Sequence, residues 1–324
     1  MTYEVWTEFA ELMSPTEWIG LAVVLLGSTA LWLTAAFLAV RIAAESLGWR
    51  KKDRPSRWLR RGVFALCAVY AVVFAYAYWV EPTQLVLKRL RVESAKLPVG
   101  TTLRVAHVTD LHAQIDRLRH LERTAEAVVD LQPDIVLLTG DYLCNFCSGA
   151  PTALLAFLLR LPDVPVYAVP GNYGGRLPAD AILETIGIEI LHSESRLFTV
   201  AGVPLELFGA SPRRRAMNLR PRRAPDRFGI FLEHFPSLLP SVAEKGWDLF
   251  LAGHTHGGQV RLPGYGAIVT LDLMGKTFEM GAYQVADTTA MISAGVGMEC
   301  RWAPQVRLFC PPEIVLIEVV GRSP

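Results

Sequence analysis

Two long stretches of this chain lack charged residues. Neither Ile19–Val40 nor Gly62–Val80 contains Asp, Glu, Lys or Arg, although such residues make up 19% of the sequence. Each stretch is long enough to cross a hydrocarbon core about 30 Å thick as a helix. The alternative is a pair of helices buried in a globular core, where uncharged runs of about 20 residues are rare. The sequence therefore predicts two N-terminal transmembrane helices.

Basic residues are absent before the first of these stretches. Residues 1–18 contain acidic side chains but no Lys or Arg, which does not fit a cleaved signal peptide. Basic side chains instead dominate the linker at 41–61, and the positive-inside rule places such a linker in the cytoplasm. The chain after Val80 is then predicted on the far side of a cell membrane that it crosses twice. Further basic residues at 88–96 keep one alternative open, a re-entrant second helix that leaves the domain cytoplasmic.

The sequence has little net charge and few cysteines. A net charge of +1 gives no sign of nucleic-acid binding. The five cysteines are an odd number and make no disulfide framework. Cys144 and Cys147 have the spacing of a zinc or redox pair, but no second pair of this spacing accompanies them, so both interpretations are weak. Nothing in the sequence indicates the oligomeric state.

One stretch is rich in arginine and proline. It starts at residue 212 and continues to residue 227. A solvated loop and a clamp for an anionic substrate or lipid headgroup both fit this composition. The candidate substrate-binding residues in this stretch are Arg213, Arg214 and Arg215.

After residue 101, short apolar runs alternate with helical periodicity, which is typical of one α/β domain. Strands are predicted at Leu103–Thr109, Ile135–Thr139, Val164–Val169, Leu205–Phe208, Phe228–Leu232 and Leu249–Ala252, and helices at Arg117–Leu131 and Thr152–Arg160. The chain thus divides into an acidic tail (1–18), a membrane anchor (19–80), a connector (81–101) and the α/β domain (102–324).

Polar residues directly follow several of the predicted strands. Ligands of open α/β sheets bind at the carboxyl ends of the strands, so we expect these side chains to meet. Each alone has a structural explanation, such as a turn cap for Asp110 or Asp141 and a satisfied core histidine for His234. Together they form a set of metal-binding side chains. The set consists of Asp110, His112, Asp141, Asn172, His234, His254 and His256.

Two of these histidines lie one residue apart, in Gly253-His254-Thr255-His256-Gly257. Residues i and i+2 of an extended segment point to the same side, so the pattern predicts a strand end at which both imidazoles face one point. The flanking glycines let the backbone turn sharply and approach a ligand. An isolated pair of this kind is more often a surface turn, and the polar strand ends upstream favour the metal site.

Asp110-x-His112, Gly140-Asp141, Gly171-Asn172, His234 and Gly253-His254-x-His256 follow one another in this order. This set resembles the calcineurin-like metallophosphoesterase superfamily, from about Leu103 to Val319. The likeness is greatest to its membrane-anchored bacterial branch, which includes anchored phosphodiesterases and UDP-2,3-diacylglucosamine hydrolases. This second likeness rests on the sequence segments 253–259 and 309–314.

The resemblance implies an α/β fold of two facing β-sheets flanked by helices, and two divalent metal ions. By position, Asp110, His112, Asp141 and His256 would hold one ion, and Asp141, Asn172, His234 and His254 the other. This mixed donor set suits Mn²⁺, with Fe or Zn²⁺ as alternatives, better than Mg²⁺ or Ca²⁺. Two ions about 3.5–4 Å apart neutralise phosphoryl oxygens and supply a nucleophile at neutral pH.

The chain departs from the family pattern after Asn172. The family usually has His followed by Asp or Glu there, and that His helps to protonate the leaving group; this chain has Tyr173 and Gly174. Loss of a general acid typically costs about 10²–10⁴ in rate, less for a good leaving group. His192 and the arginine-rich stretch are possible substitutes for the donor. The candidate catalytic residues are Asn172, Tyr173 and His254.

Two functions follow from these patterns. The first is a membrane-anchored dimetal phosphoesterase that hydrolyses a phosphodiester or pyrophosphate bond of an anionic, amphiphilic substrate among membrane lipids, such as UDP-2,3-diacylglucosamine. That compound is made in the cytoplasm, so an external domain would favour a phospholipid or a cell-envelope polymer. The alternative, motivated by Tyr173 and Gly174, is a metal-binding but catalytically weak regulatory or binding protein.

Overall fold

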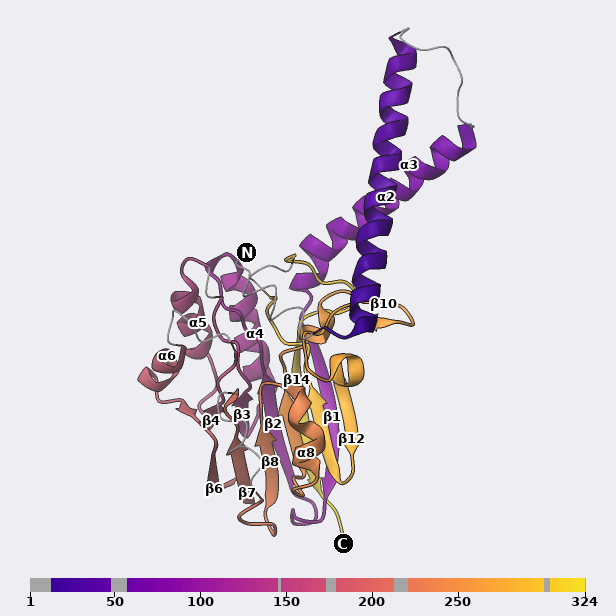
Figure 1. The fold of residues 1–324 in the computed structure, drawn as a ribbon. Coiled ribbons are helices and arrows are strands. Elements are labelled where there is room, and N and C mark those ends of the chain that lie inside the picture. Colours follow the sequence, from indigo (N-terminus) through magenta and orange to yellow (C-terminus); the bar gives the residue numbers. More distant parts are fainter. Residues whose placement is uncertain are drawn as a thin grey trace.

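Two long helices extend away from an α/β body, as Figure 1 shows. The computed structural model describes residues 13–47, 57–144, 147–172, 179–212, 221–299 and 304–323. Helix α2 (Pro15–Ser46) begins at a capping box, in which Ser14 and Glu17 accept hydrogen bonds from each other's backbone N–H groups. Helix α3 (Arg57–Ala75) continues through a π-helical turn, Tyr76–Val80, and a 3₁₀ turn, Glu81–Thr83.

Both helices are long and apolar enough to cross a membrane. Within an 18-residue apolar stretch of each helix, only 11% of the residues are buried, so neither helix belongs to the core of the α/β body. At 1.5 Å per residue, α2 is about 48 Å long, more than the hydrocarbon core requires. The uncharged stretches Ile19–Val40 and Gly62–Val80 fall inside these helical segments, as the sequence predicted.

The α/β body contains two six-stranded sheets and a short hairpin. The first sheet, in spatial order, is β1 (Val86–Ser94), β14 (Glu313–Gly321), β2 (Thr102–Val108), β3 (Ile135–Leu138), β4 (Val166–Ala168) and β5 (Glu189–Ile190). The second is β12 (Gly281–Val285), β13 (Thr288–Ile292), β9 (Leu249–Ala252), β8 (Phe228–Leu232), β7 (Val203–Gly209) and β6 (Glu194–Val200). The hairpin pairs β10 (Arg261–Leu262) with β11 (Gly266–Ala267). This agrees with the expected pair of sheets flanked by helices.

The core follows from the alternation of side chains along the strands. In β2, Val105 packs between the two sheets, whereas Ala106 packs against the helices outside the first sheet. Those helices are α4 (Leu118–Asp130), α5 (Ala150–Leu158) and α6 (Ala179–Thr185). On the outer face of the second sheet, Phe231 packs with Trp247 and with the short helix α8 (Leu239–Ala243). The body thus has two sheets in the middle and helices outside.

The strand directions place one end of the body beside the long helices. Strand β1 starts directly after the end of the α3 segment, and it pairs in parallel with β14. Because β14 is antiparallel to β2, and β3 and β4 are parallel to β2, the carboxyl ends of β2, β3 and β4 lie at the end where β1 starts. We call this end the helix-proximal end of the body.

The predicted strands and helices overlap the observed ones, but the predicted connector at 81–101 is not separate from the domain. It contributes β1, which pairs with β14 along its whole length. Strand β1 lies at the edge of its sheet, and its charged residues Lys88, Arg89 and Arg91 are exposed. Edge strands commonly carry exposed charges, which obscured the strand in the sequence.

Candidate metal centre

Side chains from four strand ends meet at the helix-proximal end of the body. Asp110 and His112 follow β2, Asp141 follows β3, and His234 follows β8. His256 lies just beyond β9, and all five of these residues are buried. The sequence predicted that polar residues at strand ends would come together, and the structure brings these five into two groups that share Asp110.

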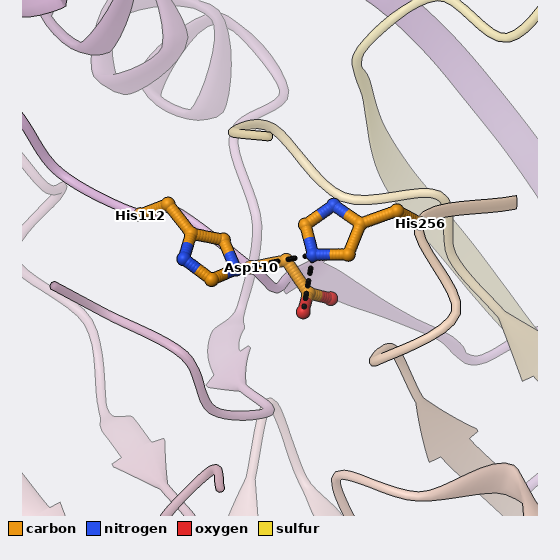
Figure 2. Close-up of side chains that lie close together, drawn as sticks. All are labelled: Asp110, His112 and His256. Atoms are coloured by element: carbon orange, nitrogen blue, oxygen red, sulfur yellow. Dashed lines mark hydrogen bonds and ion pairs between the residues drawn. The ribbon is translucent and has the colours of Figure 1, made fainter. Parts of the chain in front are cut away.

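The first group consists of Asp110, His112 and His256, as Figure 2 shows. The Nε2 atom of His256 lies 3.4 Å from Oδ1 of Asp110 and 3.1 Å from Nε2 of His112. Oδ1 of Asp110 is buried and has no hydrogen-bond partner among the described residues. A buried carboxylate oxygen that faces two imidazole nitrogens matches the donors a divalent cation takes, so these residues fit a metal ion.

The second group consists of Asp110, Asp141 and His234. Oδ2 of Asp141 lies 3.2 Å from Nε2 of His234 and 3.6 Å from Nε2 of His112, so this carboxylate lies between the two groups. Asn172 contributes Oδ1, which lies 2.7 Å from Nε2 of His234. The two clusters suggest a binuclear divalent metal site. The carboxylates of Asp110 and Asp141 would neutralise part of the positive charge of the ions.

His254 lies at the edge of the second group. Its Nδ1 atom is 3.1 Å from Oδ1 of Asn172, the oxygen that also faces His234. Its Nε2–H donates to the carbonyl oxygen of Leu271 at 2.9 Å, because a carbonyl can only accept. In His234, Nδ1–H donates to the carbonyl of Thr139 at 2.7 Å. Each backbone carbonyl therefore fixes the ring orientation and leaves the other nitrogen available to a metal ion.

The backbone carries the strain of this arrangement. Asp110, His112, Asp141, His254 and His256 all have positive φ angles, between 38° and 69°. Non-glycine residues rarely adopt this region, and strained residues of this kind cluster at functional sites. The predicted extended backbone at His254 and His256 is therefore wrong. Their rings approach the site from two left-handed residues and not from one face of a strand.

Glycines permit the close approach of the site loops. A Cβ atom at Gly171 would lie 2.1 Å from Oδ1 of Asp141, and one at Gly253 would lie 2.2 Å from Oδ2 of Asp110. Both contacts are shorter than any real Cβ contact, so a side chain at either position would displace a site carboxylate. The glycines in Gly171-Asn172 and Gly253-His254 thus have a steric reason.

The electrostatics of the site depend on burial and on the mutual contacts. Burial raises the pKa of the Asp110 carboxyl. Burial lowers the pKa of His256, and the neighbouring His112 adds to that effect. Burial also acts to lower the pKa of His234, but the carboxylates of Asp141 and Asp110 outweigh it and raise the pKa to about 9. The metal-free cluster therefore retains protons, which bound metal ions would replace.

Several predicted residues do not join this cluster or lie outside the described residues. Tyr173, Arg213, Arg214 and Arg215 lie outside the described residues. His192 is partly exposed, with Nε2 3.9 Å from Oδ2 of Asp180. Arg222, from the arginine-rich stretch, is buried and pairs with Glu206 and Asp248. Asp248 directly precedes β9, whose other end carries the site, so Arg222 serves the fold at the opposite end of the body.

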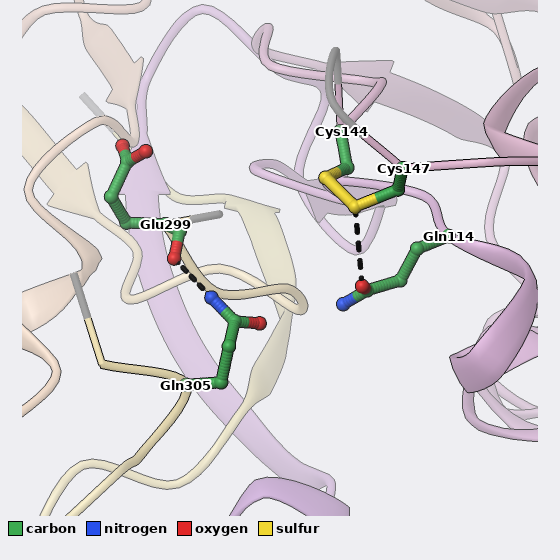
Figure 3. The surroundings of a disulfide bond; sticks show 5 residues. All are labelled: Gln114, Cys144, Cys147, Glu299 and Gln305. Atoms are coloured by element: carbon green, nitrogen blue, oxygen red, sulfur yellow. Dashed lines mark hydrogen bonds between the residues drawn. A yellow bond between two sulfur atoms is a disulfide. The ribbon is translucent and has the colours of Figure 1, made fainter. Parts of the chain in front are cut away.

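A disulfide links Cys144 and Cys147 beside the site, as Figure 3 shows. The sequence predicted no disulfide framework, so this local pair is a correction. Cys144 follows the Asp141 loop, and Sγ of Cys147 contacts Oε1 of Gln114, two residues after His112. Spacing alone does not distinguish a disulfide from a reduced pair. The contact between the loops after β2 and β3, at Ala113 and Leu143, is visible only in the fold.

Sequence reasoning also missed residues that support the site without belonging to it. Arg307 is buried and donates to the carbonyls of Ala294, Gly295, Gly297 and Cys310. The loop it holds donates in turn to Asp110, through the Gly297 amide and the Asp110 carbonyl at 2.6 Å. Thr109 donates its hydroxyl to Oδ2 of Asp110 at 2.8 Å. A lone arginine near the end of the sequence carries no pattern that would indicate this role.

Comparison with known proteins agrees with this geometry. Residues 103–258, which include all of the clustered side chains, match the model of the calcineurin-like phosphoesterase family. These residues therefore form a calcineurin-like phosphoesterase domain. It is 25% identical over 292 residues to the uncharacterized metallophosphoesterase YkuE of Bacillus subtilis (strain 168), covering 84% of this chain and all of that relative. It is 26% identical over 258 residues to the phosphodiesterase YaeI of Escherichia coli (strain K12), covering 76% of this chain and 93% of that relative.

The family and the site together define the class of reaction. The domain is that of a metal-dependent phosphoric ester hydrolase, and the two buried clusters contain carboxylate and imidazole side chains of the kind that could hold its metal ions. The resemblance noted in the sequence is confirmed at the level of the family.

Proposed function

We propose that this chain is a membrane-anchored dimetal phosphodiesterase that cleaves a phosphodiester or pyrophosphate bond of a lipid-linked substrate outside the cytoplasm. The observation that carries the proposal is the position of the metal centre. Its ligands lie at the end of the body from which the apolar helices leave, and the β1 start and the ends of β2, β3 and β4 share that end. A hydrolase placed in this way faces the lipid surface.

The aromatic residues of the second helix support membrane anchoring. Trp58 lies at the basic end of α3 with Arg57 and Arg61 against its ring, and Trp79 lies at the opposite end, beside Tyr78. At 1.5 Å per residue these tryptophans are about 30 Å apart along the helix axis, close to the thickness of a hydrocarbon core. Tryptophan and tyrosine favour the two interfaces of a bilayer, so the helix has the ends that a spanning helix needs.

Two observations support an extracytoplasmic domain. The linker between the helices is basic, and the positive-inside rule favours the cytoplasm for it. The opposite ends of both helices, which contact the body, would then lie on the outer side of the membrane. The disulfide between Cys144 and Cys147 lies in the body, and disulfides persist in oxidising compartments. An external site favours a phospholipid or a cell-envelope phosphodiester over UDP-2,3-diacylglucosamine, which is made in the cytoplasm.

The proposed chemistry requires neutralisation of the negative charge on the phosphate. Bound divalent ions would neutralise the phosphoryl oxygens and supply a nucleophile at neutral pH. Asp110, His112, Asp141 and His256 would hold one ion, and Asp141, Asn172, His234 and His254 the other. Thr109 orients the Asp110 carboxylate, while the Thr139 and Leu271 carbonyls orient the rings of His234 and His254. Mn²⁺ suits this mixed donor set, with Fe or Zn²⁺ as alternatives.

The test uses the full chain, purified in detergent and loaded with Mn²⁺. We expect it to hydrolyse a chromogenic phosphodiester, and we expect Asp141→Ala and His254→Ala to lose metal and turnover. Asp287→Ala is the matched control, because this carboxylate is exposed in the turn from β12 to β13 and lies outside both clusters. A panel of phospholipids and UDP-2,3-diacylglucosamine then identifies the substrate class. Metal binding without turnover on any of these substrates would refute the enzyme and favour the regulatory alternative.

A further inference from the structure

Several exposed apolar side chains lie on loops beside the metal centre. They are Leu262 and Tyr265 of the β10–β11 hairpin, Leu273 and Met274 of the loop after Leu271, and Phe309 near the start of β14. Leu273 is 54% exposed and Phe309 is 61% exposed, which is unusual for large apolar side chains beside an enzyme site. We call these five residues the apolar rim.

The hairpin reaches along the first membrane helix. The Tyr265 hydroxyl donates to the carbonyl of Thr16 at 2.8 Å. A Cβ atom at Gly20 would lie 2.7 Å from that hydroxyl, so the Tyr265 ring packs against α2 beyond its first turn. Figure 1 shows β10 beside the base of α2. A bilayer that surrounds α2 from its first turns therefore also surrounds the hairpin.

The Phe309 segment is held against the end of the second membrane helix. The Arg307 amide donates to the carbonyl of Ala77 at 2.9 Å, and the Cys310 amide donates to the Glu81 carboxylate at 2.5 Å. Phe309 lies between these anchors with a φ of 54°, a strained conformation for an aromatic residue. The contacts on either side hold this segment against the α3 segment while the Phe309 ring stays exposed.

The rim is connected directly to the metal-binding histidines. The carbonyl of Leu271, two residues before Leu273, accepts from Nε2 of His254. The thiol of Cys310, next to Phe309, donates to the carbonyl of His256 at 3.2 Å. The rim therefore borders the metal centre on the side formed by these two histidines.

We propose that the apolar rim inserts into the interfacial layer of the bilayer, so that a phosphodiester in the headgroup layer reaches the metal centre without leaving the membrane. The partner of this surface is the lipid bilayer itself, since the rim is continuous with two membrane helices at the same depth. This inference rests on the proposed membrane-anchored function, and it adds the surface and the route by which the substrate enters.

The first experiment measures depth and does not depend on activity. The full chain carries a nitroxide spin label on a cysteine introduced at Leu273, and it is reconstituted in vesicles of phosphatidylcholine and phosphatidylglycerol. Val99 is the matched control position, because it is exposed and lies in the turn from β1 to β2 at the opposite end of the body. Among the described residues the free cysteines Cys67 and Cys310 are buried, and Cys300 is replaced by serine in both labelled variants. We expect the label at 273 to lose collisions with a water-soluble nickel chelate and gain them with oxygen; equal collisions at 273 and 99 overturn the proposal.

The second experiment separates this inference from the proposed function. Leu273→Asp is expected to lower the turnover of a phosphodiester lipid in vesicles by about tenfold. Insertion of one leucine side chain into the bilayer changes the partition of the rim between water and membrane by at least that factor. Turnover of a soluble chromogenic diester should stay within about twofold in the same variant, and Val99→Asp should change neither rate. If Leu273→Asp hydrolyses the vesicle lipid at the wild-type rate, the inference about the rim is overturned and the proposed function still stands. If the wild type hydrolyses neither substrate, the proposed function fails, and the depth measurement still decides the inference.

Discussion

The contact between Glu17 and the loop at 268–275 allows a sharp prediction, because it joins the apolar helix α2 to His254 of the candidate metal centre. The Glu17 carboxylate is fully buried and accepts from the amide and the hydroxyl of Thr270, both at 2.6 Å. Its other oxygen accepts from the amide of Ser14 at 2.8 Å, which caps α2. Thr270 directly precedes Leu271, whose carbonyl orients His254. Removal of this carboxylate should therefore loosen the loop and weaken the metal site.

The magnitude follows from the donors that lose their acceptor. In Glu17→Ala the buried Thr270 amide and hydroxyl lose charge-assisted hydrogen bonds, which costs about 2–3 kcal/mol, and the lost cap costs about 1 kcal/mol. The loss at Thr270 alone should make the loop open about 30–150 times more often. Glu17→Gln keeps one oxygen but turns an NH₂ group toward the remaining donors, so about half of the free energy should be lost. Loss of a ring-orienting contact typically weakens metal affinity about 10–100-fold.

The assay is hydrogen exchange of the 265–275 peptide in the full chain, together with Mn²⁺ titration. We expect the Thr270 amide to exchange fastest in Glu17→Ala, at an intermediate rate in Glu17→Gln, and slowest in the wild type. Thr16→Ala is the matched control, since the Thr16 hydroxyl is exposed and pairs with Ser14, and the carbonyl contact to Tyr265 is kept. Unchanged exchange in Glu17→Ala would refute the reasoning, and faster exchange with wild-type metal affinity would refute the link to His254.

Three further predictions concern the site and its surroundings. Gly253→Ala should displace the Asp110 carboxylate and abolish metal loading, measured by elemental analysis, while circular dichroism shows a retained fold. Mn²⁺ binding should release protons and strengthen as the pH rises toward 9, because His234 is protonated below about that pH in the metal-free chain; titration in buffers of different ionisation enthalpy tests this. Burial lowers the pKa of His107 to about 3, below its unfolded value, so its contribution to stability is complete above about pH 6.5 and falls by about 1.4 kcal/mol per pH unit below it. His107→Gln should flatten that dependence in acid unfolding experiments, and an unchanged slope would contradict it.

The sequence predicted the strands and the residue types at their ends, because these depend on local patterns. Alternation and apolar runs mark β2, β3, β8 and β9, and Asp110, Asp141 and His234 follow strands as expected. The meeting of Asp110 with Asp141 was predictable because parallel strands of one sheet bring their carboxyl ends to one edge. That His234 joins them from the second sheet followed only from the two facing sheets that the family resemblance implied. The two long apolar helices were predictable for a similar reason, since a long uncharged run needs no tertiary information.

The parts that were not predictable depend on contacts between distant segments. Glu17 was assigned to an acidic tail, yet it forms hydrogen bonds with Thr270, 253 positions later in the chain. The left-handed backbone of His254 and His256 leaves no mark in a pattern of residue types. The Leu271 carbonyl that orients His254 is a backbone group, and any residue could supply it. Such groups are visible only when the fold places them.

Strand β1 determines which way the metal centre faces. It enters the first sheet straight from the α3 segment and pairs in parallel with β14, which is antiparallel to β2. A strand that paired antiparallel with β14 from the same starting point would have turned the ends of β2, β3 and β4 away from the long apolar helices. The pairing direction of one charged edge strand therefore places the site at the end of the body where these helices lie. Because the rim loops also contact both helices, the orientation is fixed by the sheet and by Tyr265 and Cys310 independently.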